Sequence, residues 1–256
     1  MTSNILSNIR DRHVALTDGI FAIAMTILVL EIAVPTVSEI SSGVALNEYF
    51  LNSLIPSILI YFISFYIVYN FWENTVILFN FKKISNNILS LNMFTLATVC
   101  LIPFATGFLF QFNNYTNANV FFSLLIMVIS ILYIIIFILL VRNNYSRYFE
   151  RKDEIKSTIN QTYDDGIELS NLKLYFKGVM LTLFYLLLSP LLSSIISLIL
   201  AFFSPLASLL SFLLILLLRF LIRMKRSTAD KMVNIELTDD ERDLVENIRE
   251  SIYGDN

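Results

Sequence analysis

The fold is decided by one stretch near the N-terminus, residues 12–31, which reads RHVALTDGIFAIAMTILVLE. Its apolar part is interrupted only at Thr26, and the segment 14–34 is long enough to cross a bilayer as a helix. Asp18 lies in the first third of that span. A carboxylate inside a lipid-spanning helix costs about 2.5–3.5 kcal/mol on insertion scales, so it normally faces protein or water. No other predicted span carries a comparable group, and we therefore expect this helix to carry the function.

The whole chain has the composition of a polytopic membrane protein. Of its 256 residues, 56% are hydrophobic and 15% are charged, and the mean hydropathy is +0.70. A helix needs about 20 apolar residues to cross the bilayer. Six segments meet this requirement, namely residues 14–34, 51–80, 91–112, 119–141, 174–203 and 205–223. The predicted fold class is an all-α integral membrane protein with six transmembrane helices per chain.

Positive charges are confined to one side of the predicted membrane. If the six spans alternate in direction, all 18 Lys and Arg residues fall on the side of the two termini, including those at the end of the last span. The opposite loops, residues 35–50, 112–118 and 202–205, contain no Lys or Arg. Because positively charged loops stay in the cytoplasm, we expect a multi-pass protein of the plasma membrane with both termini cytoplasmic.

The sequence lacks the motifs of the common enzyme classes. His13 is the only histidine, so a histidine-based metal site or a Ser–His pair would lack parts. The chain has six glycines and no Gly-rich phosphate loop. Cys100 is the only cysteine, and its apolar neighbours predict an inert, buried thiol. We expect no enzyme, no metal or other cofactor, and no nucleic-acid partner.

The first span, read as a helix, has two distinct faces. At about 100° per residue, Ile23, Ile27 and Leu30 lie within about 60° of one another. Thr26 flanks this row of branched aliphatic side chains, whereas Asp18 points about 140° away from Ile23. Such a face fits the lining of a pore, and it also fits an ordinary packed membrane helix. Periodicity alone does not decide between the two.

A charged motif in the same span resembles the signature of a known family. The residues Arg12-x-x-x-Leu16-Thr17-Asp18-Gly19 are similar to the first-helix motif Arg-x-x-x-Phe-Ser-Asp-Gly of the transmembrane protein 175 family. This family comprises the lysosomal potassium channel and its bacterial and archaeal relatives. The sequence departs from the motif with Leu16 in place of Phe and Thr17 in place of Ser.

The second and third spans resemble the same family. The matching residues are Ser64, Phe65, Trp72, Asn92, Pro103 and Phe104. Thr75 stands three residues after the tryptophan, where the family commonly has a histidine. The resemblance covers about residues 8–110, and beyond them only the number of spans and their topology match.

The resemblance implies a potassium-preferring cation channel without the usual Gly-rich filter. Four chains would assemble in the lipid bilayer as a homotetramer, with four first helices lining the path of the permeant potassium ion. Ile23 would form the narrowest hydrophobic constriction, with Ile27 and Leu30 as the layers outside it. Thr26 would match a hydroxyl layer implicated in potassium preference.

The remaining motif residues would lie behind the pore, where they pack the helices and support assembly. They are Arg12, Asp18, Gly19, Trp72 and Asn92. The carboxylate of Asp18 would meet Arg12 or the polar groups near Trp72 and Asn92. The predicted six-helix transmembrane channel domain spans residues 1–226, followed by a cytoplasmic tail, residues 227–256, with a short amphipathic helix.

Two other functions are compatible with the sequence. The chain could be an ion-coupled secondary transporter that uses Asp18 as its coupling-ion site, since intramembrane carboxylates serve in proton and ion pathways. It could also be a non-conducting membrane scaffold whose tail helix recruits a partner.

Overall fold

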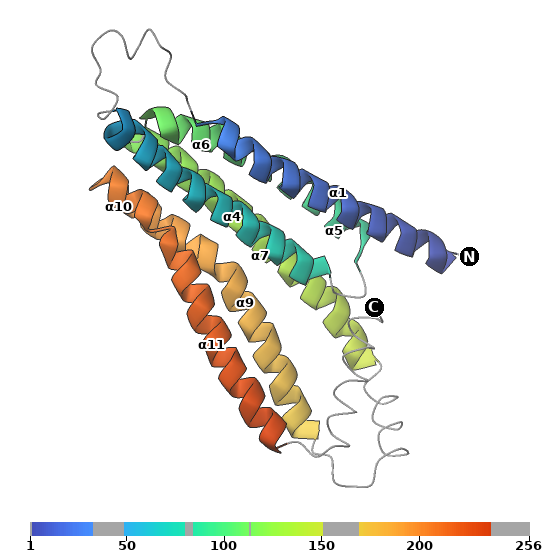
Figure 1. Cartoon of the computed structure of the whole chain (residues 1–256). Coiled ribbons are helices and arrows are strands. Elements are labelled where there is room, and N and C mark those ends of the chain that lie inside the picture. Colours follow the sequence, from blue (N-terminus) through green and yellow to red (C-terminus); the bar gives the residue numbers. More distant parts are fainter. Residues whose placement is uncertain (1, 33–48, 80–83, 113, 151–168, 237–256) are drawn as a thin grey trace.

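The computed structural model describes residues 2–32, 49–79, 84–112, 114–150 and 169–236. Every regular element in these residues is a helix (Figure 1). The elements are α1 (Thr2–Leu30), η1 (Phe50–Leu54), α4 (Ile55–Phe79), α5 (Asn86–Val99), α6 (Leu101–Phe112), α7 (Thr116–Glu150), α9 (Leu169–Leu200), α10 (Pro205–Leu210) and α11 (Leu213–Glu236). η1 is a single π-helical segment that leads into α4.

In the described part of the chain, six helical segments are long and apolar enough to cross a membrane. They are Asp11–Leu30, Ile55–Phe79, Asn86–Phe112, Thr116–Asn143, Met180–Ala201 and Pro205–Met224. Each segment overlaps one of the six spans predicted from the sequence. The fold class is therefore confirmed as an all-helical, multi-pass membrane protein.

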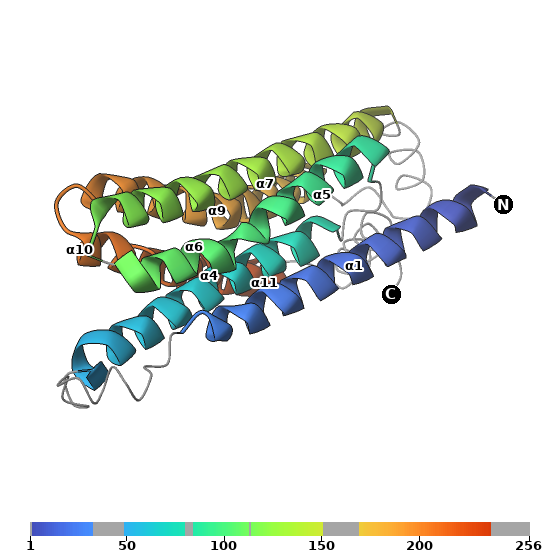
Figure 2. The same cartoon turned by 90° about the horizontal axis from the view of Figure 1, so that it is seen from above.

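The helices form an elongated bundle with α4 and α7 in its middle. α7 contacts α4, α5, α6, α9 and α10. Among the described elements, the substantial contacts of α1 are with α4, α5 and α6. α1 therefore lies at one edge of the bundle, and α4 separates it from the hairpin formed by α9 and α11 (Figures 1 and 2). This position leaves one side of α1 without a neighbour in the described part of the chain.

The third span is divided into α5 and α6 by a break at Cys100. Pro103 causes the break, because proline has no N–H to bond to the carbonyl of Val99 and its ring crowds the preceding turn. The thiol of Cys100 is exposed on the outside of the chain. The expectation that this thiol is buried is wrong, because an apolar run in a membrane helix does not distinguish a lipid-facing side from a protein-facing one.

Serine side chains pack the turn between α9 and α11. The hydroxyl of Ser197 lies 2.8 Å from that of Ser208 and 2.7 Å from that of Ser123 on α7. Ser193 donates to the carbonyl of Ser211 at 2.7 Å. Small hydroxyl residues let membrane helices approach closely and replace hydrogen bonds that lipid cannot offer. The hairpin is thus joined to α7 near the end of the bundle where α9 ends.

Two helices continue past the predicted ends of their spans. α7 runs to Glu150, beyond the predicted end of its span at residue 141, and α11 runs to Glu236, across the predicted domain boundary at residue 226. The amphipathic helix predicted for the tail lies beyond residue 236, outside the described residues.

Candidate functional site

One face of α1 is buried against the rest of the chain. Thr17, Phe21, Ala24 and Leu28 are each at most 3% exposed, and they follow one another at the spacing of four, three and four residues that places side chains on one face of a helix. This face packs on α4, α5 and α6. It fixes the rotation of α1 about its own axis.

The other face of α1 is uncovered and contains the predicted pore residues. Ile23 is 59% exposed, Ile27 is 37% exposed and Leu30 is 78% exposed, and Thr26 is also exposed between them. We call these four residues the exposed α1 face. The described residues therefore leave most of the Ile23 side chain uncovered.

The hydroxyl group of Thr26 has a defined orientation on this face. Its Oγ1 donates a hydrogen bond to the carbonyl oxygen of Ile23, at 2.9 Å. Because the proton is used by the helix's own backbone, the lone pairs of the hydroxyl oxygen remain available as acceptors. An oxygen in this state can interact with a cation.

Asp18 is joined to Trp72, so this pair of the predicted motif comes together. The indole Nε1 of Trp72 donates to Oδ1 of Asp18 at 2.9 Å, which connects α1 to α4. Arg12 is exposed and makes no ion pair with Asp18 or with any other described residue. Of the two kinds of partner expected for Asp18, the structure shows the tryptophan and not the arginine.

Asn92 of α5 contacts α1 about one turn before Asp18, on the N-terminal side. Its Nδ2 lies 3.0 Å from Nε2 of His13 and donates to Oγ1 of Thr17 at 3.4 Å. The imidazole of His13 stacks on Phe79 of α4, with ring centroids 5.5 Å apart. α5 and α4 therefore both contact the start of the membrane-spanning part of α1.

Glycines contribute in different ways to the two ends of α1. At Gly19 an added Cβ would meet no atom within 4 Å, so the packing of this chain alone does not require glycine there. At the other end, the carboxylate of Glu31 lies directly against Gly107 of α6, where a Cβ would overlap it. A larger residue than Gly107 would therefore force the carboxylate of Glu31 to move away from α6.

Thr75, the residue that replaces the family's usual histidine, connects α4 to α7. Its hydroxyl lies 2.6 Å from the phenol oxygen of Tyr133 and donates to the carbonyl of Phe71 at 3.0 Å. The ring of Tyr133 stacks on that of Phe71, with centroids 5.4 Å apart. All three residues are buried.

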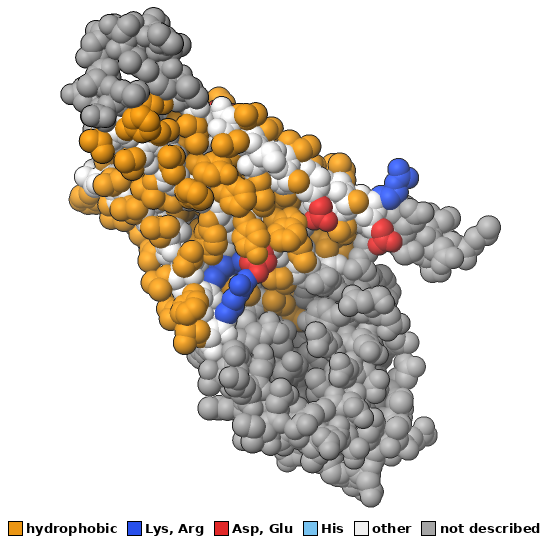
Figure 3. Space-filling view, viewed as in Figure 1, with side chains coloured by type: hydrophobic (Ala, Val, Ile, Leu, Met, Phe, Trp, Pro, Cys, Tyr) orange, Lys and Arg blue, Asp and Glu red, His pale blue; other side chains and the backbone are white. Residues whose placement is uncertain are grey.

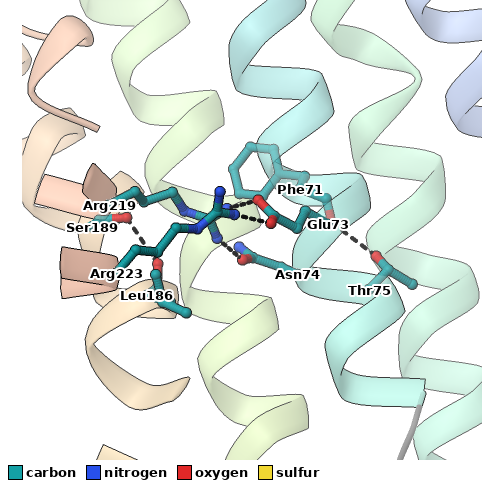
Figure 4. Close-up of polar contacts among 8 residues, drawn as sticks. All are labelled: Phe71, Glu73, Asn74, Thr75, Leu186, Ser189, Arg219 and Arg223. Carbon is teal, nitrogen blue, oxygen red and sulfur yellow. Dashed lines mark hydrogen bonds and ion pairs between the residues drawn. The ribbon is translucent and has the colours of Figure 1, made fainter. Parts of the chain in front are cut away.

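A buried cluster of polar residues between α4 and α11 was missed by the sequence analysis. Arg219 is only 3% exposed, and its guanidinium donates to the carboxylate of Glu73 and to the amide oxygen of Asn74 (Figure 4). The amide oxygen of Asn70 accepts from Nε of the same guanidinium at 2.6 Å, in the amide orientation that satisfies both groups. Arg223, which is 57% exposed, pairs with the other oxygen of Glu73.

We call these five residues the arginine cluster. The cluster lies between α4 and α11. Figure 3 shows blue and red side chains side by side in the middle of a largely hydrophobic face, apart from a second group of charged side chains toward the right of the view. The expectation that no other span carries a charge comparable to Asp18 is therefore wrong. Asn70, Glu73 and Asn74 share one face of α4 at the spacing i, i+3 and i+4, and this polar row within an apolar span was the signal available in the sequence.

No metal site is evident in the described part of the chain. It contains no group of three or more His, Cys, Asp or Glu side chains that could hold a metal ion. Polar groups of α1 instead contact polar groups of α4 and α5, in the Asp18–Trp72 and His13–Asn92 pairs.

Comparison with known proteins finds a family model that matches the first three spans. A family model described as the endosomal/lysosomal potassium channel TMEM175 matches residues 12–103. These residues run from the start of the α1 motif to Pro103 in α6, and thus contain the Asp18–Trp72 and His13–Asn92 contacts. The first three spans of the chain therefore match the TMEM175 family. The resemblance of its first three spans to that family is confirmed.

Similar proteins include two bacterial potassium channels and one solved structure. A potassium channel of Chryseobacterium sp. is 28% identical over 177 residues, which cover 69% of this chain and 84% of that protein. A potassium channel of Streptomyces collinus is 29% identical over 106 residues, which cover 41% of this chain and 50% of that protein. The crystal structure of a lysosomal potassium-selective channel TMEM175 homolog from Chamaesiphon minutus superimposes with a TM-score of 0.59 at 22% identity, over 84% of this chain and 98% of that chain.

The hydrogen bond between Asp18 and Trp72 predicts different effects for two substitutions. Asp18→Leu leaves the indole N–H without its acceptor and should destabilise the protein by about 1–3 kcal/mol. Asp18→Asn keeps an oxygen acceptor and should cost less than Asp18→Leu. Thermal unfolding of the purified protein measures both, and equal losses for the two variants would contradict a hydrogen-bonding role.

The arginine cluster predicts that its two arginines differ sharply in importance. Arg219→Gln removes the buried partner of Glu73 and leaves Asn70 and Asn74 without a donor, which should cost about 3–5 kcal/mol. Arg223→Gln removes an exposed partner of the same carboxylate and should cost at most about 1 kcal/mol. Thermal unfolding of the two variants, side by side, checks the difference. Similar melting temperatures would show that burial of Arg219 does not matter.

Proposed function

We propose that this protein is a potassium-preferring cation channel in which four identical chains place α1 around a central pore. Potassium transport is supported by the family and by the two bacterial relatives, both of which are named potassium channels. The pore assignment rests chiefly on the exposed α1 face, which lies at the edge of the bundle and is covered by no described residue. Such an open face can lie at the contact between copies of the chain, where close packing and polar contacts hold helices together in lipid.

Cyclic symmetry explains how one chain can form a pore. Copies of a chain arranged around a rotation axis present the same surface to the centre, and a closed ring leaves no copy with an open side. An edge helix such as α1 can reach the axis, whereas α7 lies in the middle of the bundle and contacts five other described elements. Gly19 supports close approach between copies, because the space beside it is empty within one chain.

The side chains of the exposed α1 face suggest how ions are controlled. A ring of Ile23 side chains is apolar, and water confined there loses hydrogen bonds that it cannot replace, so the ring opposes ion passage by dewetting. Ile27 and Leu30 would extend this apolar lining toward the end of α1. Thr26 would supply the side-chain oxygen within it, and its acceptor lone pairs could replace part of the hydration shell of potassium.

The proposed channel lies in the plasma membrane with both termini in the cytoplasm. This orientation rests on the distribution of Lys and Arg, which the opposite loops lack. Residues 1–226 would form the channel domain and residues 227–256 a cytoplasmic tail. The Asp18–Trp72 and Asn92–His13 contacts would lie near the cytoplasmic side and hold α1 in place behind the pore.

Ion flux through liposomes that contain only the purified protein tests the proposed function. A potassium gradient should dissipate through the protein without a second driving ion, and in proportion to the amount of protein reconstituted. Transport that requires a proton or sodium gradient would instead identify a coupled transporter. Absence of flux from a folded, correctly assembled protein would overturn the channel proposal in favour of a scaffold.

Ile23→Asn tests the constriction. Four amide groups in the ring would hold water where isoleucine excludes it, so potassium flux should increase and discrimination among monovalent cations should weaken. The matched control is Ile138→Asn on α7, a residue of similar exposure at 54% that lies outside the proposed pore. Flux assays with both variants decide the matter. If Ile23→Asn assembles normally and conducts no better than the control, Ile23 does not form the barrier.

Thr26→Val tests the hydroxyl layer. The substitution removes the only side-chain oxygen of the exposed α1 face at almost constant volume. A loss of about 1 kcal/mol in ion coordination would lower the potassium-to-sodium permeability ratio about fivefold. Reversal potentials in mixed ions measure the ratio, and a serine at the same position should retain most of it. An unchanged ratio in Thr26→Val would exclude coordination by this hydroxyl.

A further inference from the structure

The arginine cluster lies on the opposite side of α4 from the contact with α1, at the same level. Trp72, which donates to Asp18 on α1, is followed directly by Glu73, which pairs with Arg219 on α11. Successive residues of a helix point about 100° apart. One turn of α4 therefore contacts α1 on one side and α11 on another side.

We infer that Arg219 is a positioning residue for α1, which acts by holding α4 in the rotation at which Trp72 reaches Asp18. An effect of Arg219 on ion conduction rests on the proposed function, whereas its effect on the Trp72–Asp18 hydrogen bond does not. Arg219 is a buried charge that lies outside the proposed pore.

The contacts of Arg219 are suited to fixing the rotation of a helix. Its planar guanidinium bonds to Asn70, Glu73 and Asn74, which span one turn of α4 on a single face. All three bonds are strained if α4 turns about its axis, because each acceptor then moves sideways relative to a rigid donor. A single hydrogen bond would tolerate such a movement far better.

A small rotation of α4 is enough to break the contact with α1. A helix with its side chains is about 10–12 Å across, so a rotation of about 20° moves the outer end of a side chain by about 2 Å. The Trp72–Asp18 hydrogen bond is 2.9 Å long, and a contact longer than about 3.5 Å is no longer a hydrogen bond. A rotation of this size thus exceeds what the Trp72–Asp18 hydrogen bond can absorb.

Other polar contacts of α4 provide the competing explanation. Thr75 bonds to Tyr133 on α7 at 2.6 Å, and Thr106 on α6 donates to Ser64 at 3.1 Å. If these contacts alone fixed α4, removal of Arg219 would leave Trp72 in place. The test below distinguishes the two cases.

Trp72 is the only tryptophan of the chain, so its fluorescence reports the contact directly. We compare the emission spectra of the full-length protein and of Arg219→Gln, with Asp18→Leu as the reference for a broken contact. Arg142→Gln is the matched control, because Arg142 is an exposed arginine of α7 that makes no described contact with α4. We expect Arg219→Gln to shift the emission maximum toward that of Asp18→Leu and the control to match the parent protein.

A double variant and a conservative variant make the test specific. Arg219→Gln combined with Asp18→Leu should give the spectrum of Asp18→Leu alone, because the contact can be lost only once. Arg219→Lys keeps the charge but cannot bond to all three α4 side chains, and it should give a smaller shift in the same direction. This milder variant also serves if Arg219→Gln does not fold.

The outcomes separate the inference from the proposed function. If Arg219→Lys is folded and its emission equals that of the parent, while Thr75→Val shifts it, α7 positions Trp72 and the inference is overturned. If the predicted shift occurs, Arg219 positions α1 whether or not the protein conducts. In a conducting protein, Arg219→Lys should also change potassium flux in the same direction as Asp18→Leu, and an opposite change would contradict transmission through Trp72.

Discussion

Polar contacts made by α4 are the interaction on which the rest of the bundle depends. In lipid the hydrophobic effect does not favour the association of apolar helices, so packing of small residues and hydrogen bonds between helices must hold them together. α4 supplies such bonds to α1 through Trp72, to α7 through Thr75 and to α11 through Glu73. Its polar residues therefore determine where its neighbours lie, although α4 carries none of the proposed pore residues.

The exposed α1 face is meaningful only because α1 is held so firmly on its other side. Thr17, Phe21 and Leu28 are buried against the chain, and Asp18 and His13 add hydrogen bonds to α4 and α5. With its rotation set in this way, α1 must present Ile23 and Leu30 outward. A chain with a rigid helix at its edge and an apolar outer face is suited to assembly around an axis, as the proposed channel requires.

The sequence predicted the six spans, but it did not predict the polar contacts between them. All six spans were found because a helix must match the thickness of the hydrocarbon layer, and this requirement is written in the length of each apolar run. The two faces of the first span were also predicted from periodicity, and the structure leaves Ile23, Thr26, Ile27 and Leu30 on a common exposed face. By contrast, Arg219 was counted among the charges at the end of the last span, since its position along the chain does not reveal the direction of its side chain.

The sequence by itself determined that the chain has six membrane-spanning segments and that its first three resemble the TMEM175 family. Hydrophobic length and a charged motif within a span are properties of neighbouring residues, so both can be found without the tertiary structure. The tertiary structure alone decided the partners of the polar groups. Asp18 bonds to Trp72, 54 positions away, and Arg219 to Glu73, 146 positions away. A polar side chain in lipid must find a partner, yet several partners satisfy that requirement equally well in the sequence. Only the packing of α4 between α1 and α11 selects among them.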